Sequence, residues 1–201
     1  MFTGIVECMG SVTEIVKDKS NKTFWIESPI SNLLNVNQSV SHDGVCLTVE
    51  EVKRNRHRVT AIDETLEKSN LQNWEKGRRV NLERGLQLTS LVDGHIVQGH
   101  VDAKGKCKNI ENKNGSHVYT ISYPSKFAKL LIEKGSIAIN GTSLTVYEVK
   151  NDTFCVAIIP YTLGQTNFSY MNMGDSVNLE FDMVGKYILR NVLLADFENR
   201  V

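Results

Sequence analysis

The sequence has little of several features that would point to particular classes of protein. Its 23 basic and 23 acidic side chains balance, so no net field draws the chain to nucleic acid or to an anionic membrane. No apolar stretch approaches the roughly 20 residues of a transmembrane helix. The opening sequence MFTGIVECMG has no basic segment followed by an apolar one, so we expect no signal peptide. We therefore expect a cytoplasmic protein that binds neither nucleic acid nor membrane.

Cysteine and proline are also scarce. The four cysteines show no CxxC spacing and have no histidine at the spacing of a zinc site, so we expect free thiols and no metal. The chain has only three prolines, and 41% of its residues are apolar, which is enough for a hydrophobic core in each half.

The chain contains a tandem duplication. Residues 43–83 align with residues 140–180 without a gap, at a constant offset of 97 (140 − 43). The strongest blocks are DGVCLTVEEV (43–52) against NGTSLTVYEV (140–149) and GRRVNLE (77–83) against GDSVNLE (174–180). A period of this length is that of a small domain and is far too long for a solenoid repeat. Two related pockets on one chain would suit chemistry on two similar molecules.

Both halves have the pattern of β-structure. Short runs rich in β-branched and aromatic residues alternate with turn formers. Five or six strands in fewer than 100 residues leave no room for crossover helices, so we expect antiparallel pairing in a small closed barrel or a sandwich. The expected strands are 12–16, 23–27, 45–52, 58–62 and 80–83, then 119–122, 136–139, 142–149, 154–159 and 177–181. Helical turns are expected at 31–34, 65–71, 125–133 (with Ser125 as a cap) and 162–168.

The tail has no counterpart in the first half. The sequence MVGKYILRNVLLADFENR, from residue 183, predicts a helix that is apolar around most of its circumference. Two interpretations stay open at this point. The helix packs on its own barrels, or it is buried among copies of itself.

Small polar residues alternate along one strand in each half. Cys46 and Thr48 share a strand face, with Leu47 opposite, and Ser143 and Thr145 share the matching face of the second half. Such a pair suits hydrogen bonding to a flat heterocycle. The pattern is explained equally well by a polar strand edge whose hydrogen bonds are made to neighbouring turns.

Several blocks together resemble riboflavin synthase. They are MFTGIVE (1–7), SVSHDGVCLTV (39–49), DETL (63–66), GHIVQGHVD (94–102), NGTSLTV (140–146) and VNLEFD (177–182). The resemblance implies an all-β fold of two tandem six-stranded antiparallel Greek-key β-barrels, with a C-terminal α-helix that holds three chains together. We therefore expect lumazine-binding barrels at 1–90 and 91–182, and an oligomerisation helix at 183–201.

The resemblance also implies a reaction and its residues. Two molecules of 6,7-dimethyl-8-ribityllumazine would dismutate to riboflavin and a ribitylamino-pyrimidinedione, with no metal or organic cofactor, in a homotrimer. Lumazine synthase is a further candidate partner. The expected catalytic residues are His100 as acid or base, Ser143 and Cys46 as nucleophiles or water-orienting groups, and Ser39 and Asp182. His95 is expected to support its loop, while His57 and His117 are expected in turns without a role.

The resemblance divides the binding residues between the barrels. The expected first-barrel site comprises Gly4, Ile5, Val6, Cys46, Leu47, Thr48, Thr60, Ala61, Ile62, Asp63, Glu64 and Thr65. The expected second-barrel site comprises Gly99, His100, Val101, Lys134, Ser143, Leu144, Thr145, Ala157, Ile158, Ile159, Pro160, Tyr161 and Thr162.

Two other functional classes are alternatives to this enzyme. One is a non-catalytic antenna protein that holds a lumazine or a flavin in the same double barrel, and it would be expected to lose the polar residues that this chain keeps. The other is an unrelated β-barrel binding module. Formation of flavin from the lumazine would distinguish the enzyme from both.

Overall fold

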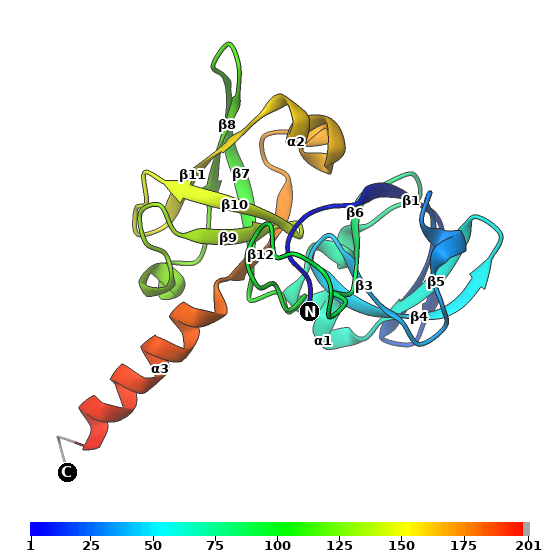
Figure 1. Cartoon of the computed structure of the whole chain (residues 1–201), viewed down its shortest axis with the longest axis horizontal. Helices are drawn as coiled ribbons and strands as arrows, with labels where there is room; N and C mark the ends of the chain where they lie inside the picture. The colour runs from blue at the N-terminus through cyan, green and yellow to red at the C-terminus, as the bar shows by residue number, and fades with distance from the viewer. Residues whose placement is uncertain (199–201) are drawn as a thin grey trace.

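The computed structural model describes residues 1–198 and contains two β-barrels that lie side by side, with one long helix projecting from the second (Figure 1). The strands of the first barrel are β1 (Cys8–Asp18), β2 (Asn21–Glu27), β3 (Ser39–His42), β4 (Val45–Lys53), β5 (Arg56–Ala61) and β6 (Arg79–Arg84). Those of the second are β7 (Ala103–Asn112), β8 (His117–Ser122), β9 (Ser136–Ile139), β10 (Thr142–Tyr147), β11 (Thr153–Ile158) and β12 (Ser176–Phe181).

Short helices connect the strands. The α-helices are α1 (Asp63–Lys68), α2 (Pro160–Gln165) and α3 (Met183–Glu198). The 3₁₀ helices are η1 (Ser31–Leu33), η2 (Asn70–Asn73), η3 (Ser125–Leu130) and η4 (Asn167–Tyr170). In the described part of the chain, no helix has the length and apolar character needed to cross a bilayer.

The two barrels share one topology. Neighbouring strands follow the order β1-β2-β5-β4-β3-β6 in the first barrel, and the corresponding strands of the second are arranged in the same cyclic order. Every pairing is antiparallel and both sheets close. The predicted fold class is therefore confirmed. Because each sheet closes on itself, neither barrel has an edge strand with unpaired backbone groups along its length.

Residue alternation explains how each strand meets its core. In β5, His57, Val59 and Ala61 are buried, whereas the residues between them are half-buried. The pattern differs in β6 and β12, where four or five consecutive residues are buried. These two strands face their own core on one side and the junction between the barrels on the other, which is why Asn and Glu alternate with apolar residues in VNLE.

The junction between the barrels is a symmetric polar network. Asn81 and Asn178 hold the same repeat position (81 + 97 = 178). The backbone N–H of Asn81 donates to Asp43 (2.7 Å), and that of Asn178 donates to Asn140 (2.8 Å). Their side-chain amides then cross over, from Asn81 to the carbonyl of Asn140 (2.9 Å) and from Asn178 to the carbonyl of Asp43 (2.8 Å). Such buried and paired amides fix one arrangement of the two barrels.

Three local predictions were wrong. Ser125 does not cap a helix, because η3 is a 3₁₀ helix with Pro124 at its N-cap position and no side-chain cap. His57 is fully buried inside the first barrel, and His117 begins β8, so neither lies in a turn. The predicted strands also left out β3 in the first barrel and β7 in the second. β7 reads AKGKCKNIEN, and its lysines and glycine hide a regular alternation of buried and exposed residues.

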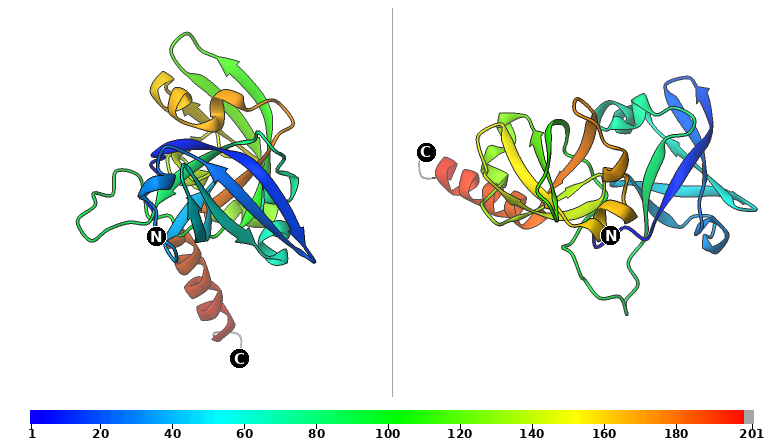
Figure 2. Two further views of the ribbon diagram at one scale, coloured as in Figure 1. Left: turned by 90° about the vertical axis from the view of Figure 1, so that its right-hand side faces the viewer. Right: turned by 90° about the horizontal axis from the view of Figure 1, so that it is seen from above.

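Helix α3 leaves the second barrel and points away from the first (Figure 2). Several apolar side chains on it are about half exposed or more in the single chain, including Val184, Ile188, Val192 and Leu193. The alternative in which this helix packs fully on its own barrels is therefore not observed. Residues 199–201 of the predicted oligomerisation unit lie outside the described residues.

Candidate functional site

The segment that precedes each barrel crosses to the other barrel. Gly4, which comes before β1, lies on β10, where its carbonyl accepts a hydrogen bond from the N–H of Ser143 (2.8 Å). Gly99, which comes before β7, lies on β4, where its carbonyl accepts from the N–H of Cys46 (2.8 Å). The predicted grouping of these segments was therefore wrong. Residues 4–6 belong beside Ser143, and residues 99–101 belong beside Cys46.

Both crossings require glycine. Gly4 has φ +77° and Gly99 has φ +83°, a backbone region that other residues rarely adopt. A Cβ added at Gly4 would lie 2.6 Å from the Cβ of Ser143, and one added at Gly99 would lie 2.6 Å from the Cβ of Cys46. The segment can therefore lie flat on the strand only where the side chain is absent.

The crossing of Gly99 over β4 forms a pocket of about 240 Å³. Its walls come from β4, from α1 and from the crossing segment of the other half, and His100 and Cys46 face the same space. The lining residues are Val45, Cys46, Glu64, Thr65, Lys68, Ser69, Gly99, His100 and Val101. Six of them were predicted as site residues. Lys68 was not, and it pairs with Glu64 (Nζ to Oε1 2.7 Å) at the surface of the pocket.

Beside the crossing of Gly4 over β10, a histidine lies against the other small polar residue. Nδ1 of His95 lies 2.7 Å from Oγ of Ser143. Burial lowers the pKa of His95, and the nearby carboxylate of Asp182 opposes this shift. His95 and Ser143 are therefore in direct contact, and the charge of Asp182 acts on the His95 ring. His95 was expected only to support its loop, and no sequence signal distinguished it, because it has no counterpart in the first half.

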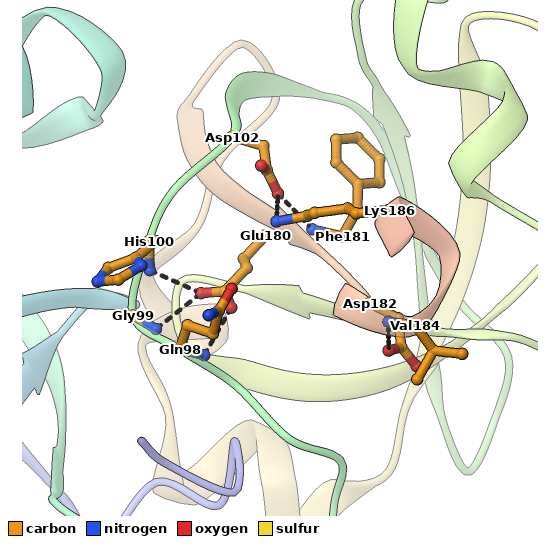
Figure 3. A network of polar contacts seen from close by, with 9 residues as sticks. All are labelled: Gln98, Gly99, His100, Asp102, Glu180, Phe181, Asp182, Val184 and Lys186. Carbon is orange, nitrogen blue, oxygen red and sulfur yellow. Dashed lines mark hydrogen bonds and ion pairs between the residues drawn. The ribbon is translucent and has the colours of Figure 1, made fainter. Parts of the chain in front are cut away.

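A buried glutamate holds the backbone of each crossing segment. Glu180 of β12 accepts hydrogen bonds from the consecutive N–H groups of Gln98, Gly99 and His100, as Figure 3 shows. Glu83 of β6 accepts from the N–H and hydroxyl of Thr3 and from the N–H of Gly4. The last residue of the repeat motif VNLE is therefore a glutamate whose carboxylate accepts hydrogen bonds from backbone N–H groups. The sequence pattern predicted no role for either glutamate.

The other predicted site residues fall into three groups. Thr48 and Thr145 are exposed on β4 and β10, outside the barrel cores, and Ser39 lies opposite Thr48 on β3. The side chains of Leu47, Ala61 and Ile158 lie in the barrel cores, so only their backbone groups are available to a ligand.

The remaining residues lie on the outer surface or at its edge. Ile62, Ile159 and Tyr161 are exposed around the starts of α1 and α2, together with Asp63 and Pro160. Thr60 pairs with Thr23 across the strands (Oγ1 to Oγ1 2.9 Å). Lys134 is exposed, with Nζ 5.4 Å from the centre of the Tyr147 ring. Ile5 and Ala157 are exposed, and Val6, Leu144 and Thr162 are half-buried.

Comparison with known proteins assigns the double barrel to a family. The lumazine binding domain matches twice, over residues 3–85 and 98–182. Riboflavin synthase of Mycobacterium bovis is 41% identical over 197 residues, which cover 94% of this chain and 97% of that protein. Riboflavin synthase of Bacillus subtilis is 36% identical, with 94% of this chain and 89% of that protein covered. The chain belongs to the riboflavin synthase family.

Solved structures agree with this fold. The crystal structure of LumP complexed with riboflavin superposes with a TM-score of 0.85, covering 90% of this chain and 99% of that one, at 23% identity. A structure of LumP complexed with 6,7-dimethyl-8-(1'-D-ribityl) lumazine gives a TM-score of 0.82. Like its riboflavin synthase relatives, the chain is an enzyme, a transferase. Within residues 1–198 no three His, Cys, Asp or Glu side chains gather as metal ligands would.

Proposed function

We propose that this riboflavin synthase converts two molecules of 6,7-dimethyl-8-ribityllumazine into riboflavin and 5-amino-6-ribitylamino-pyrimidinedione. One molecule gives a four-carbon unit to the other, and the two products together contain every atom of the two substrates, so no outside oxidant is needed. The observation that carries the proposal is the pair of related crossings. At one, His100 and Cys46 line a single pocket, and beside the other His95 lies against Ser143.

The pockets provide the groups that the chemistry requires. The reaction begins when a base removes a proton from an acidic ring methyl of one lumazine, and a nucleophile adds to the ring of its partner. His100 and His95 are candidates for proton transfer. Ser143 and Cys46 are candidates for the nucleophile or for orienting a water molecule. Ser39 and Asp182 complete the proposed catalytic set. Alignment of the two rings would supply several kcal/mol of the catalysis.

We further propose that three chains associate through α3 and that each active site joins the first pocket of one chain to the second pocket of another. The exposed apolar side chains of α3 support this, since burying each could contribute about 1.5–3 kcal/mol before entropy costs. Deleting residues 183–201 should leave barrels that bind lumazine but fail to trimerise and turn over poorly. Light scattering beside an activity assay tests this, and a fully active full-length monomer at nanomolar concentration would contradict it.

The remaining parts of the proposal concern organisation and location. Residues 1–90 and 91–182 are proposed as the lumazine-binding units and 183–201 as the unit of assembly, in a cytoplasmic enzyme. Lumazine synthase is a proposed partner, since a physical complex would pass one product of that enzyme directly to this one. Co-sedimentation of the two proteins would test the association.

A second candidate function is a non-catalytic carrier of lumazine or flavin, which the structural likeness to ligand-bound LumP favours. The two functions are separated by mixing the chain with the lumazine. The proposed reaction forms one riboflavin for every two lumazines consumed. Flavin fluorescence and chromatography measure the product and the remaining lumazine. Tight binding of unchanged lumazine would favour the carrier.

A further inference from the structure

We propose that Glu180 and Glu83 are positioning residues that act crosswise, each holding the backbone that completes the pocket of the other barrel. Glu180 belongs to the second barrel and builds the first-barrel pocket beside Cys46. Glu83 belongs to the first barrel and holds the segment that lies beside Ser143 on the second. The role of these pockets in binding rests on the proposed function, whereas the positioning itself does not.

Glu180 is surrounded by donors from one short segment. Its Oε1 accepts from the N–H of Gln98 (2.6 Å), and its Oε2 accepts from the N–H groups of Gly99 and His100 (both 2.9 Å) (Figure 3). The residue is only 3% exposed. Three successive N–H groups that converge on one anion form the backbone arrangement that binds phosphates and other anions elsewhere. Here the anion is the protein's own side chain, and it fixes the path of the segment.

That path determines the pocket. The segment held by Glu180 turns at Gly99, whose carbonyl then accepts from the N–H of Cys46 (2.8 Å). The next residues, His100 and Val101, form one wall of the pocket beside Cys46. Among the described residues, the side chain of Glu180 makes hydrogen bonds to the backbone N–H groups of residues 98–100 and to no side chain that lines the pocket. It therefore acts through the position of His100 rather than on a ligand.

Glu83 repeats the arrangement in the other direction. It occupies the same repeat position as Glu180 (83 + 97 = 180). Its Oε1 accepts from the N–H (2.6 Å) and hydroxyl (2.7 Å) of Thr3, and its Oε2 accepts from the N–H of Gly4 (3.0 Å). The carbonyl of Gly4 accepts from the N–H of Ser143 (2.8 Å). The duplication has therefore preserved a crosswise support in both halves.

Each segment has a second tie, and only that of the Glu180 segment reaches α3. In the first barrel, Glu7 accepts from the N–H of Arg84 (2.7 Å) and pairs with the guanidinium of the same residue (2.9 Å). Asp102, two residues after His100, accepts from the N–H of Phe181 (2.9 Å) and pairs with Lys186 of α3 (2.6 Å) (Figure 3). The backbone that carries His100 is thereby connected to the root of the helix that projects from the barrel. A change in the orientation of α3 would therefore affect the position of His100 in the first-barrel pocket more directly than it would affect the segment beside Ser143.

The first experiment measures amide hydrogen exchange without ligand in the unsubstituted chain, in Glu180→Gln and in Glu83→Gln. Glutamine has nearly the same shape but replaces one accepting oxygen by a donor group. Glu180→Gln should raise exchange at residues 98–100 by roughly 10- to 100-fold and leave residues 3–4 unchanged, and Glu83→Gln should do the reverse. Equal effects of both variants on both segments would indicate a general loss of stability and would overturn the proposal.

Two further measurements test the proposal even if a variant fails to fold or the proposed function is wrong. In the unsubstituted chain, the amides of residues 98–100 should exchange slowly, although they lie outside the strands, and free exchange there would overturn the proposal even if neither variant folds. Riboflavin should protect Cys46 from alkylation, and the half-protecting concentration should rise roughly 10-fold or more in Glu180→Gln but less than about twofold in Glu83→Gln.

The outcomes are distinguishable. Unchanged protection of Cys46 in a folded Glu180→Gln variant would overturn the role of Glu180 in completing the pocket. Failure of riboflavin to protect Cys46 in every chain, including the unsubstituted one, would count against the proposed function. In that case the crosswise pattern of amide exchange would still decide whether the two glutamates hold their segments.

Discussion

A pair of histidines inside the first barrel should make the protein sensitive to acid. The Nε2 atoms of His42 and His57 lie 2.8 Å apart, and both residues are fully buried. Nδ1 of His42 donates to the carbonyl of Val40 (3.0 Å), because a carbonyl only accepts. His42 therefore accepts at Nε2 from His57, whose Nδ1 then accepts from the hydroxyl of Ser31 (2.9 Å). Every hydrogen bond is satisfied while both rings are neutral.

Adding a proton to either ring disrupts this chain of bonds. Burial lowers the pKa of His57 from 6.5 to about 4 and lowers that of His42 well below its usual range, where the neighbouring His57 adds to the shift. Between pH 6.5 and about 4 the unfolded chain binds a proton that the folded chain rejects, so stability falls as the pH falls. At 1.36 kcal/mol per pKa unit, His57 alone should account for about 3 kcal/mol over this interval.

The second barrel supplies the matched control. At the offset of 97, His42, His57 and Ser31 correspond to Ile139, Phe154 and Ala128. The triple variant His42→Ile, His57→Phe, Ser31→Ala should therefore build an apolar core of a kind that the chain already contains. Its free energy of unfolding should fall less steeply with acid than that of the unsubstituted chain, by more than about 3 kcal/mol between pH 6.5 and 4, because His42 adds to the contribution of His57.

The measurement is denaturant unfolding at a fixed protein concentration and at several pH values from 7.5 to 4. Asp43, which is fully buried, has a pKa raised by burial to about 7, so its contribution to stability runs in the opposite direction, falling as the pH rises. It is present in both chains and cancels in the comparison. Parallel stability curves for the two chains would refute the assignment of a buried neutral histidine pair.

Three further predictions concern the pockets and the junction. Thr145→Val should weaken binding of a lumazine analogue by about 0.5–1.5 kcal/mol, and unchanged affinity in a titration would exclude Thr145 from the pocket. Ser143→Ala and His100→Gln should each lower kcat by about 100- to 10,000-fold with a much smaller effect on binding, and near-normal steady-state turnover in both would contradict their roles. Gly44→Ala should melt at a lower temperature than Gly77→Ala. Both glycines have positive φ, but only at Gly44 would the new Cβ meet backbone, 2.7 Å from a neighbouring nitrogen, so equal melting temperatures would count against a tight junction.

The duplication made the fold predictable. The repeat of 97 residues and the strand-like runs were visible in the sequence, and they predicted a small antiparallel barrel or sandwich in each half. The resemblance to a known family favoured two barrels. The strands that were overlooked were β3, whose sequence SVSH is mostly polar, and β7, whose lysines masked the alternation in AKGKCK. His57 was misread because a histidine between arginines resembles a solvent-exposed turn. Only the closed barrel shows that its side chain points inward.

The site was less predictable because it depends on contacts between the halves. The sequence pointed to Cys46, His100 and Ser143 as candidate site residues, but residues 4–6 were assigned to the first barrel from the family resemblance. The crossing of Gly4 to Ser143 is a contact between residues 139 positions apart (143 − 4), and no pattern within a single repeat encodes it. His95 was missed for the same reason, since its partner is Ser143 of another strand.

The central claim is that each active site joins a first pocket to a second pocket from a different chain. The most direct test mixes two variants, His100→Gln and Ser143→Ala, after dissociating both and allowing them to reassociate together. In a cyclic assembly about a quarter of the sites would then contain two intact pockets, so riboflavin formation should recover to about that fraction of the unsubstituted rate. If mixed assemblies form and activity stays at the level of the separate variants, the two pockets of one chain would have to work together, and the account would be contradicted.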